Sequence, residues 1–294
     1  MARPPETLQT SMLGQLIYGV VPIQTLDANG ELRGSGTGFI LQLEASGFKV
    51  PLIITARHVV EDAAQLRIRF HQQLEDGRPA PGPGRTATLP GGPPIVFPHP
   101  DPTVDIAAIQ LLHFTAVAIS EGWKPFYQYM PPQAAPEPAF LAKLEAIEEV
   151  YMIGYPNGVF DSHNNLPVAR SGITATPAMV DYEGRPEFLV DMAVYYGSSG
   201  SPVFVRKTHQ FINADGLLQE NAQLRWLGVL HSGHHLDETG EISAYDGAPP
   251  AQVRFRQMIN LGVCVRAETV LALKELVRAA SITQASWETA RSPA

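Results

Sequence analysis

Short apolar runs, rich in valine, isoleucine and leucine, recur along the chain and are separated by turn residues. Runs of about four to eight such residues between turn signals are typical of β-strands. The pattern predicts ten strands, which lie within residues 15–26, 34–44, 49–56, 65–70, 105–112, 148–156, 188–195, 202–205, 225–232 and 261–267. Ten strands joined by glycine- and proline-containing turns favour an all-β protein built from barrels or a sandwich.

Helical periodicity is sparse and is clearest near the C-terminus. Residues 268–280 place Val270, Leu273 and Val277 at helical spacing, which predicts a helix there. Residues 71–94 are rich in proline and glycine and predict a long surface loop, while residues 130–139 predict a connector between two halves.

A wider stretch around the first loop, residues 71–103, is a candidate lid or docking surface, although a plain insertion is the favoured interpretation. We expect loose tails at residues 1–12 and 281–294.

Composition narrows the class of protein. The chain has 294 residues, of which 45% are hydrophobic and 17% charged, so it can bury a substantial core. A formal net charge of -8 gives no reason to expect a nucleic acid or an anionic membrane as partner. The single cysteine, Cys264, cannot form an intramolecular disulfide, and no stretch approaches the roughly 18 apolar residues of a membrane helix. We therefore expect a cytoplasmic protein in a reducing compartment.

Three short stretches carry residues that can act together. His58 follows a buried apolar run in "LIITARHVV", Asp105 begins another in "VDIAAIQLL", and Ser199 lies in "YYGSSGSPVF". A serine hydroxyl becomes a good nucleophile when an imidazole takes its proton, and a carboxylate fixes the tautomer of that imidazole. The order His, Asp, Ser also argues against an α/β-hydrolase, whose order is Ser, Asp, His.

The three stretches resemble the motifs of chymotrypsin-like (trypsin-fold) serine peptidases. Residues 55–58 match "TAxH", residues 105–108 match "DIAL", and residues 197–202 match "GxSGxP". Bacterial glutamyl endopeptidases and HtrA-type peptidases are the nearest kinds, with further similarity in "GSGTGFIL", "MIGYPNG" and "LGVLHSG".

The resemblance implies two six-stranded antiparallel β-barrels at 13–125 and 138–267, closed by a C-terminal helix within 268–280, with the active site between them. It implies that Ser199 is the nucleophile, His58 the base and Asp105 the residue that orients His58. The backbone amides of Gly197 and Ser199 would form the oxyanion hole. No cofactor is implied, and the substrate would be a protein or peptide.

Ser198 stands where animal digestive relatives carry an aspartate that pairs with a new N-terminus. The resemblance therefore suggests no such zymogen switch, and a regulatory protein partner is one way to restrain the activity.

The same resemblance assigns a substrate pocket. Its base would be Ala193 and Val194, and its far wall would come from residues that follow on the next strands, namely His231, Ser232, Gly233 and Gly262. A base without a carboxylate favours an apolar or small P1 residue. Glutamate is the competing preference, because glutamyl endopeptidases place a histidine near the register of His231.

Each motif also has an ordinary structural interpretation. "GSSGSP" alone is usually a polar loop, and the histidines His231, His234 and His235 are more often solvated than metal ligands. Cys264 is expected to be a small buried residue. Two other functions stay open: a trypsin-fold module that binds peptides without cutting them, and a hydrolase of small esters.

Overall fold

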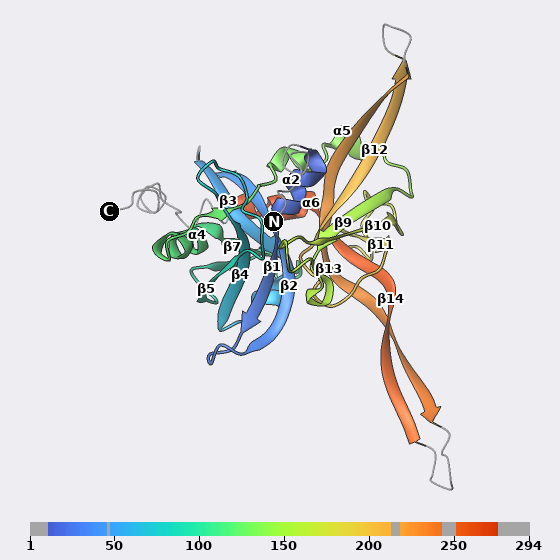
Figure 1. The fold of residues 1–294 in the computed structure, drawn as a ribbon. Coiled ribbons are helices and arrows are strands. Elements are labelled where there is room, and N and C mark those ends of the chain that lie inside the picture. Colours follow the sequence, from blue (N-terminus) through green and yellow to red (C-terminus); the bar gives the residue numbers. More distant parts are fainter. Residues whose placement is uncertain (1–10, 46–47, 213–217, 243–250, 276–294) are drawn as a thin grey trace.

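The computed structural model describes residues 11–45, 48–212, 218–242 and 251–275, and strands dominate it (Figure 1). The strands form two systems: an eight-stranded sheet from the first half of the chain and a closed six-stranded barrel from the second. The all-β prediction of a chymotrypsin-like double-barrel fold is therefore confirmed. Every strand-to-strand ladder between named strands is antiparallel.

The first sheet has the strand order β5-β4-β1-β2-β3-β7-β6, with β8 paired to β4. Its strands are β1 Val20–Leu26, β2 Leu32–Ala45, β3 Phe48–Thr55, β4 Gln65–Gln72, β5 Arg85–Pro90, β6 Val96–Pro98, β7 Ala107–Gln110 and β8 Pro125–Phe126. Isoleucines pair across neighbouring strands, Ile23 with Ile68 and Ile40 with Ile53, and all four are fully buried in one core. Within the described strands β5 and β6 are edges, so this half is a curled half-barrel of eight strands, where the sequence predicted six.

Two expectations for this half were wrong. Residues 71–94 are not simply a loop, since β5 adds to β4 within them, and β6 pairs with β7 just beyond them. The predicted strands at 15–26 and 105–112 each contain a helix end, because α2 occupies Met12–Tyr18 and α4 occupies Leu111–Ser120. Helix α4 follows β7 directly and buries Leu111, Phe114 and Ala118, whose spacing is helical.

The second half closes into a barrel with the order β10-β11-β14-β13-β12-β9. Its strands are β9 Glu149–Gly154, β10 Val168–Thr174, β11 Glu187–Asp191, β12 Pro202–Ile212, β13 Leu218–Ile242 and β14 Ala251–Arg266. Figure 1 shows β12, β13 and β14 continuing past the barrel as two long ribbons that point in different directions. The sequence pattern predicted the apolar bases of these strands but not the polar ribbons, and it missed β10.

Short helical segments complete the described chain: α3 Arg57–Val60, η1 Pro132–Ala134, α5 Pro138–Leu141, η2 Pro156–Gly158 and α6 Ala267–Leu271. The predicted helix at 268–280 is present at its start in α6, and its last residues, 276–280, lie outside the described chain. A shared apolar cluster joins the two halves, with Phe39 and Ile54 from the sheet and Phe204 and Trp226 from the barrel. Among the described helices none is long and apolar enough to cross a membrane.

Candidate active site

His58 and Asp105 are held together by two aligned contacts within the first half. His58 lies in α3, directly after β3, and Asp105 lies just before β7, the strand paired with β3. The ring Nδ1 of His58 is 2.6 Å from Asp105 Oδ2, and the backbone amide of His58 donates to Asp105 Oδ1 at 2.9 Å. Both carboxylate oxygens therefore have a partner on the same residue, which fixes the orientation of the imidazole.

Ser199 lies in a tight loop between β11 and β12 whose shape requires two glycines. Gly197 has φ +82° and Gly200 has φ +92°, values in the left-handed region that disfavours other residues. A Cβ on Gly200 would collide with the carbonyl oxygen of Thr37. The loop is anchored by Thr37 N–H donating to Ser199 O at 2.9 Å and Gly200 N–H donating to Leu230 O at 2.7 Å.

The backbone of this loop also presents free donors. The amide of Asn157 donates to the carbonyl of Tyr196 at 2.5 Å. Because C=O and N–H point in opposite directions across a trans peptide, this bond turns the N–H of Gly197 away from Asn157. Among the described residues the amides of Gly197 and Ser199 have no acceptor. Two unpaired amides beside one serine are the arrangement that stabilises an oxyanion.

His58, Gly197 and Ser199 line one cavity of about 680 Å³. Within the described part of the chain the hydroxyl of Ser199 donates to the carbonyl of His231 at 3.0 Å and makes no hydrogen bond with His58. The structure therefore brings the three predicted triad residues to one site, with His58 and Asp105 bonded and the serine hydroxyl turned toward β13.

Thr37 on β2 joins the two halves at the loop that carries Ser199. Its hydroxyl donates to Gly197 O at 2.8 Å and accepts from the amide of Tyr155 at 2.9 Å, and the residue is fully buried. The hydroxyl of Thr55 donates in turn to the carbonyl of Thr37 at 2.7 Å. Beyond the small polar residues of "GSGTGF", no local pattern in the sequence predicts these contacts.

His231 on β13 lies between two carboxyl groups and is 8% exposed. Its Nδ1 is 3.4 Å from Asp105 Oδ2, and its Nε2 is 3.3 Å from Oε1 of Glu187, which is 3% exposed. The Nε2 contact has an ion-pair distance without hydrogen-bond alignment, since that atom has no hydrogen-bond partner among the described residues. Sequence reasoning placed His231 in the substrate pocket and missed Glu187 altogether.

The electrostatics of this group follow from burial and neighbouring charge. Burial opposes ionisation of Asp105, but the contacts with His231 and His58 outweigh it and hold the pKa of Asp105 well below its usual range. Burial also opposes a charge on His231, yet the facing carboxyls of Asp105 and Glu187 raise the pKa of His231 above its ordinary value. Both pKa shifts favour an ionised Asp105 beside a protonated His231.

The other predicted pocket residues lie close to one another where the loop after β11 meets the interior of β13 and β14. Val194 is buried, and its methyl groups face the positions that a Cβ would take on Gly233, at 3.2 Å, and Gly262, at 2.9 Å. The methyl of Met258 lies 2.5 Å from that same position on Gly233. Ala193 and Ser232, the neighbours of Val194 and Gly233 along the chain, are half-buried.

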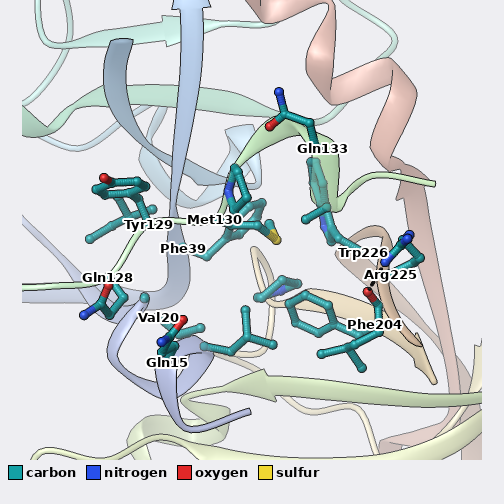
Figure 2. A pocket seen from close by; sticks show the side chains of 17 residues that line it. Gln15, Val20, Phe39, Gln128, Tyr129, Met130, Gln133, Phe204, Arg225 and Trp226 are labelled. Carbon is teal, nitrogen blue, oxygen red and sulfur yellow. Dashed lines mark hydrogen bonds between the residues drawn. The ribbon is translucent and has the colours of Figure 1, made fainter. Parts of the chain in front are cut away.

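A second cavity, of about 320 Å³, lies where β2, the connector and the bases of β12 and β13 meet (Figure 2). Figure 2 shows Gln15, Gln128 and Tyr129 on one side of this cavity and Arg225 on the other. It is mainly apolar, with Phe39, Phe204 and Trp226 among its lining residues. None of the three predicted triad residues lines it, whereas His58 and Ser199 line the larger cavity.

Comparisons with known proteins agree with this picture at the level of family. The profile of the trypsin-like peptidase domain matches residues 36–212, more than half of the chain. No curated protein shows significant similarity to the sequence. Among solved structures, the active form of the Rv3671c protease from M. tuberculosis covers 92% of this chain and 86% of its own, at 18% identity and a TM-score of 0.45. HL collagenase covers 92% of this chain and 96% of its own, at 12% identity and a TM-score of 0.45.

Proposed function

This chain belongs to the trypsin-like peptidase family, and from that membership we propose that it is a serine endopeptidase that cleaves proteins or peptides through an acyl-enzyme. The observation that carries the proposal is the bonded pair of His58 and Asp105 at the same cavity as Ser199 and its unpaired amides. These are the groups that acyl transfer by serine requires: a nucleophile, a base with its orienting carboxylate, and an oxyanion hole.

The steps use only groups of this site. The hydroxyl of Ser199 leaves the carbonyl of His231, turns to Nε2 of His58 and transfers its proton there as Oγ attacks the scissile carbonyl. Asp105 stabilises the resulting imidazolium, and the amides of Gly197 and Ser199 receive the oxyanion. His58 then gives the proton to the leaving amine, and water repeats the sequence to release the acyl group.

For specificity we propose an apolar or small P1 residue. The predicted base of the pocket, Ala193 and Val194, carries no charge, and buried Val194 approaches Gly233 and Gly262. Glutamate would need a free histidine nitrogen, but both ring nitrogens of His231 face carboxyl groups of the protein. A peptide library varied at P1 tests this: dominant cleavage after Arg or Lys contradicts it, and cleavage after Glu that His231→Ala abolishes favours the alternative.

Labelling by a fluorophosphonate probe tests the reaction class, because the probe reacts only with an activated serine. We expect the wild type to be labelled and Ser199→Ala to stay unlabelled. A folded wild type that resists the probe would indicate the peptide-binding module instead. Turnover of small esters without any peptide cleavage would indicate the ester hydrolase.

The proposal identifies the natural substrate and any partner only by chemical class: a protein or peptide substrate and a regulatory protein. We expect a cytoplasmic location, because the single cysteine suits a reducing compartment and Cys264 is buried. A regulatory protein partner is consistent with a site that carries no aspartate at Ser198. Mapping of cleavage sites in a cell lysate would identify the substrates.

A further inference from the structure

His231 connects the triad carboxylate to a second, buried carboxyl group, and none of the steps proposed above uses its side chain. We propose that His231, as an imidazolium supported by Glu187, is a positioning residue that holds Asp105 against His58 and places a positive charge near that pair. This inference rests on the proposed peptidase function of the same site. The role of His231 would be to set the position and the charge environment of Asp105 and His58, whereas the proposed function concerns the bonds that the site breaks.

The contacts place both histidines on one oxygen atom. Asp105 Oδ2 is 2.6 Å from Nδ1 of His58 and 3.4 Å from Nδ1 of His231. The backbone carbonyl of His231 also accepts the hydroxyl of Ser199 at 3.0 Å. His231 on β13 therefore contacts both Asp105, from the first sheet, and Ser199, from the barrel. Its position affects how the two halves align.

The proton count favours the charged form of His231. A neutral imidazole has one N–H and one lone pair, whereas an imidazolium has two N–H donors. Each nitrogen of His231 faces a carboxyl oxygen, Asp105 on one side and Glu187 on the other. Because the Nε2 contact lacks hydrogen-bond alignment, it acts through charge, and a neutral imidazole would leave both carboxyl groups without the cation that faces them. The raised pKa of His231 agrees with this geometry.

The surrounding charges can be enumerated for the described residues. Asp105 and Glu187 face the imidazole directly, His58 lies beyond Asp105, and Arg185 lies beyond Glu187 at 3.6 Å. On β14 the thiol of Cys264 is near enough to be affected by Glu187, and burial raises the pKa of that thiol, so it carries no charge. Arg185 is shared with Glu183, at 3.7 Å, so His231 is the cation that faces both Asp105 and Glu187. Loss of the charge on His231 would leave an uncompensated carboxylate beside His58.

A purely structural role and the proposed role make different kinetic predictions. Removing a packing residue lowers stability or the turnover number but does not move the acidic limb of the pH profile. Removing a cation close to His58 makes its protonation easier, which moves the acidic limb of the pH profile to higher pH. The acidic limb is therefore the informative measurement.

The experiment compares His231→Ala, His231→Gln and, as a control on the exposed ribbon, His235→Ala. We expect His231→Ala to lower kcat about tenfold to a hundredfold, because Asp105 and Ser199 lose their alignment. His231→Gln keeps an N–H donor but no charge, so it should recover most of kcat. In both variants the acidic limb of kcat/KM should move up by about half a unit to one unit, and His235→Ala should match the wild type. A His231→Gln profile that superimposes on the wild type would overturn the proposed tuning.

An NMR titration separates this inference from the proposed function. In Ser199→Ala protein, which has no turnover, the imidazole of His231 should stay protonated to a higher pH than that of His235. Glu187→Gln should lower the midpoint of His231. A wild type that neither cleaves peptides nor reacts with fluorophosphonate defeats the proposed function but leaves this titration intact. Equal midpoints for His231 and His235, or no response to Glu187→Gln, defeat the inference.

Discussion

The two halves of the molecule hold their parts of the site by different means. The first sheet holds His58 through aligned bonds to Asp105, and the imidazole side chain remains 46% exposed. The barrel holds Ser199 through backbone bonds and two glycines of positive φ, with the buried His231 behind it. The bonds in the sheet fix the orientation of the His58 side chain, and the bonds in the barrel fix the conformation of the loop that carries Ser199. The alignment of Ser199 with His58 therefore depends on bonds that cross the junction, such as those of Thr37.

The largest expected effect comes from removing the hydroxyl of Ser199, which the barrel contributes to the site. Ser199→Ala should lower kcat by about six orders of magnitude while the protein stays folded, because a half-buried hydroxyl contributes little to the core. Peptide turnover and thermal unfolding measure the two effects. Ser198→Ala and Ser201→Ala are the controls; a larger loss in either of them, with Ser199→Ala active, would refute the assignment.

Asp105→Asn tests the sheet side. The amide can hold the imidazole of His58 in the wrong tautomer, so kcat should fall by about four orders of magnitude. Steady-state kinetics on a peptide substrate measures the loss. Activity within about tenfold of the wild type would mean that another carboxylate orients His58. Asp101→Asn would then be the matched variant to examine.

Gly197→Ala tests whether the loop conformation itself carries function. A Cβ at φ +82° would lie 2.8 Å from Tyr155 O and 3.0 Å from the amide of Asn157. The peptide should shift and misplace one oxyanion donor, which costs about a hundredfold to a thousandfold in kcat. Gly184→Ala, at φ +73° with open space around it, is the matched control for backbone strain alone. Equal losses in both variants would show that strain, and not the oxyanion hole, explains the effect.

The site residues that the sequence could predict differ from the others in how local their signals are. His58, Asp105 and Ser199 lie in short motifs next to apolar strands, so local signals marked them. Thr37, Asn157 and Glu187 act through partners far away in the chain, and no local pattern distinguishes them from ordinary polar residues. Helix α4 was missed because β7 runs directly into it, so the apolar residues of both read as one strand.

Thr37→Val tests the junction between the halves. The substitution keeps the shape of the side chain but removes the acceptor for Tyr155 N–H and the donor for Gly197 O, both in a buried place. Unsatisfied buried groups cost about 1–3 kcal/mol each in the free energy of unfolding. We expect destabilisation of that order and a fall in kcat of about tenfold, because the nucleophile loop loosens. Thr115→Val, whose hydroxyl donates to Leu111 O within α4, should affect stability without affecting kcat. If Thr37→Val leaves kcat unchanged, the halves align without this bond.

The smallest expected effect is the pH dependence of stability that comes from the charged pair at the junction. The lowered pKa of Asp105 contributes stability above its ordinary range, near pH 4, and that contribution disappears as the pH falls through the lowered value. The raised pKa of His231 contributes stability below about pH 6.5, and that contribution disappears as the pH rises through the raised value. The free energy of unfolding of the wild type relative to His231→Gln should therefore be larger at pH 6 than at pH 9. Denaturant unfolding of both proteins at the two pH values measures this difference. A constant difference would mean that His231 binds the same number of protons in the folded and the unfolded protein, and the junction would then not raise its pKa.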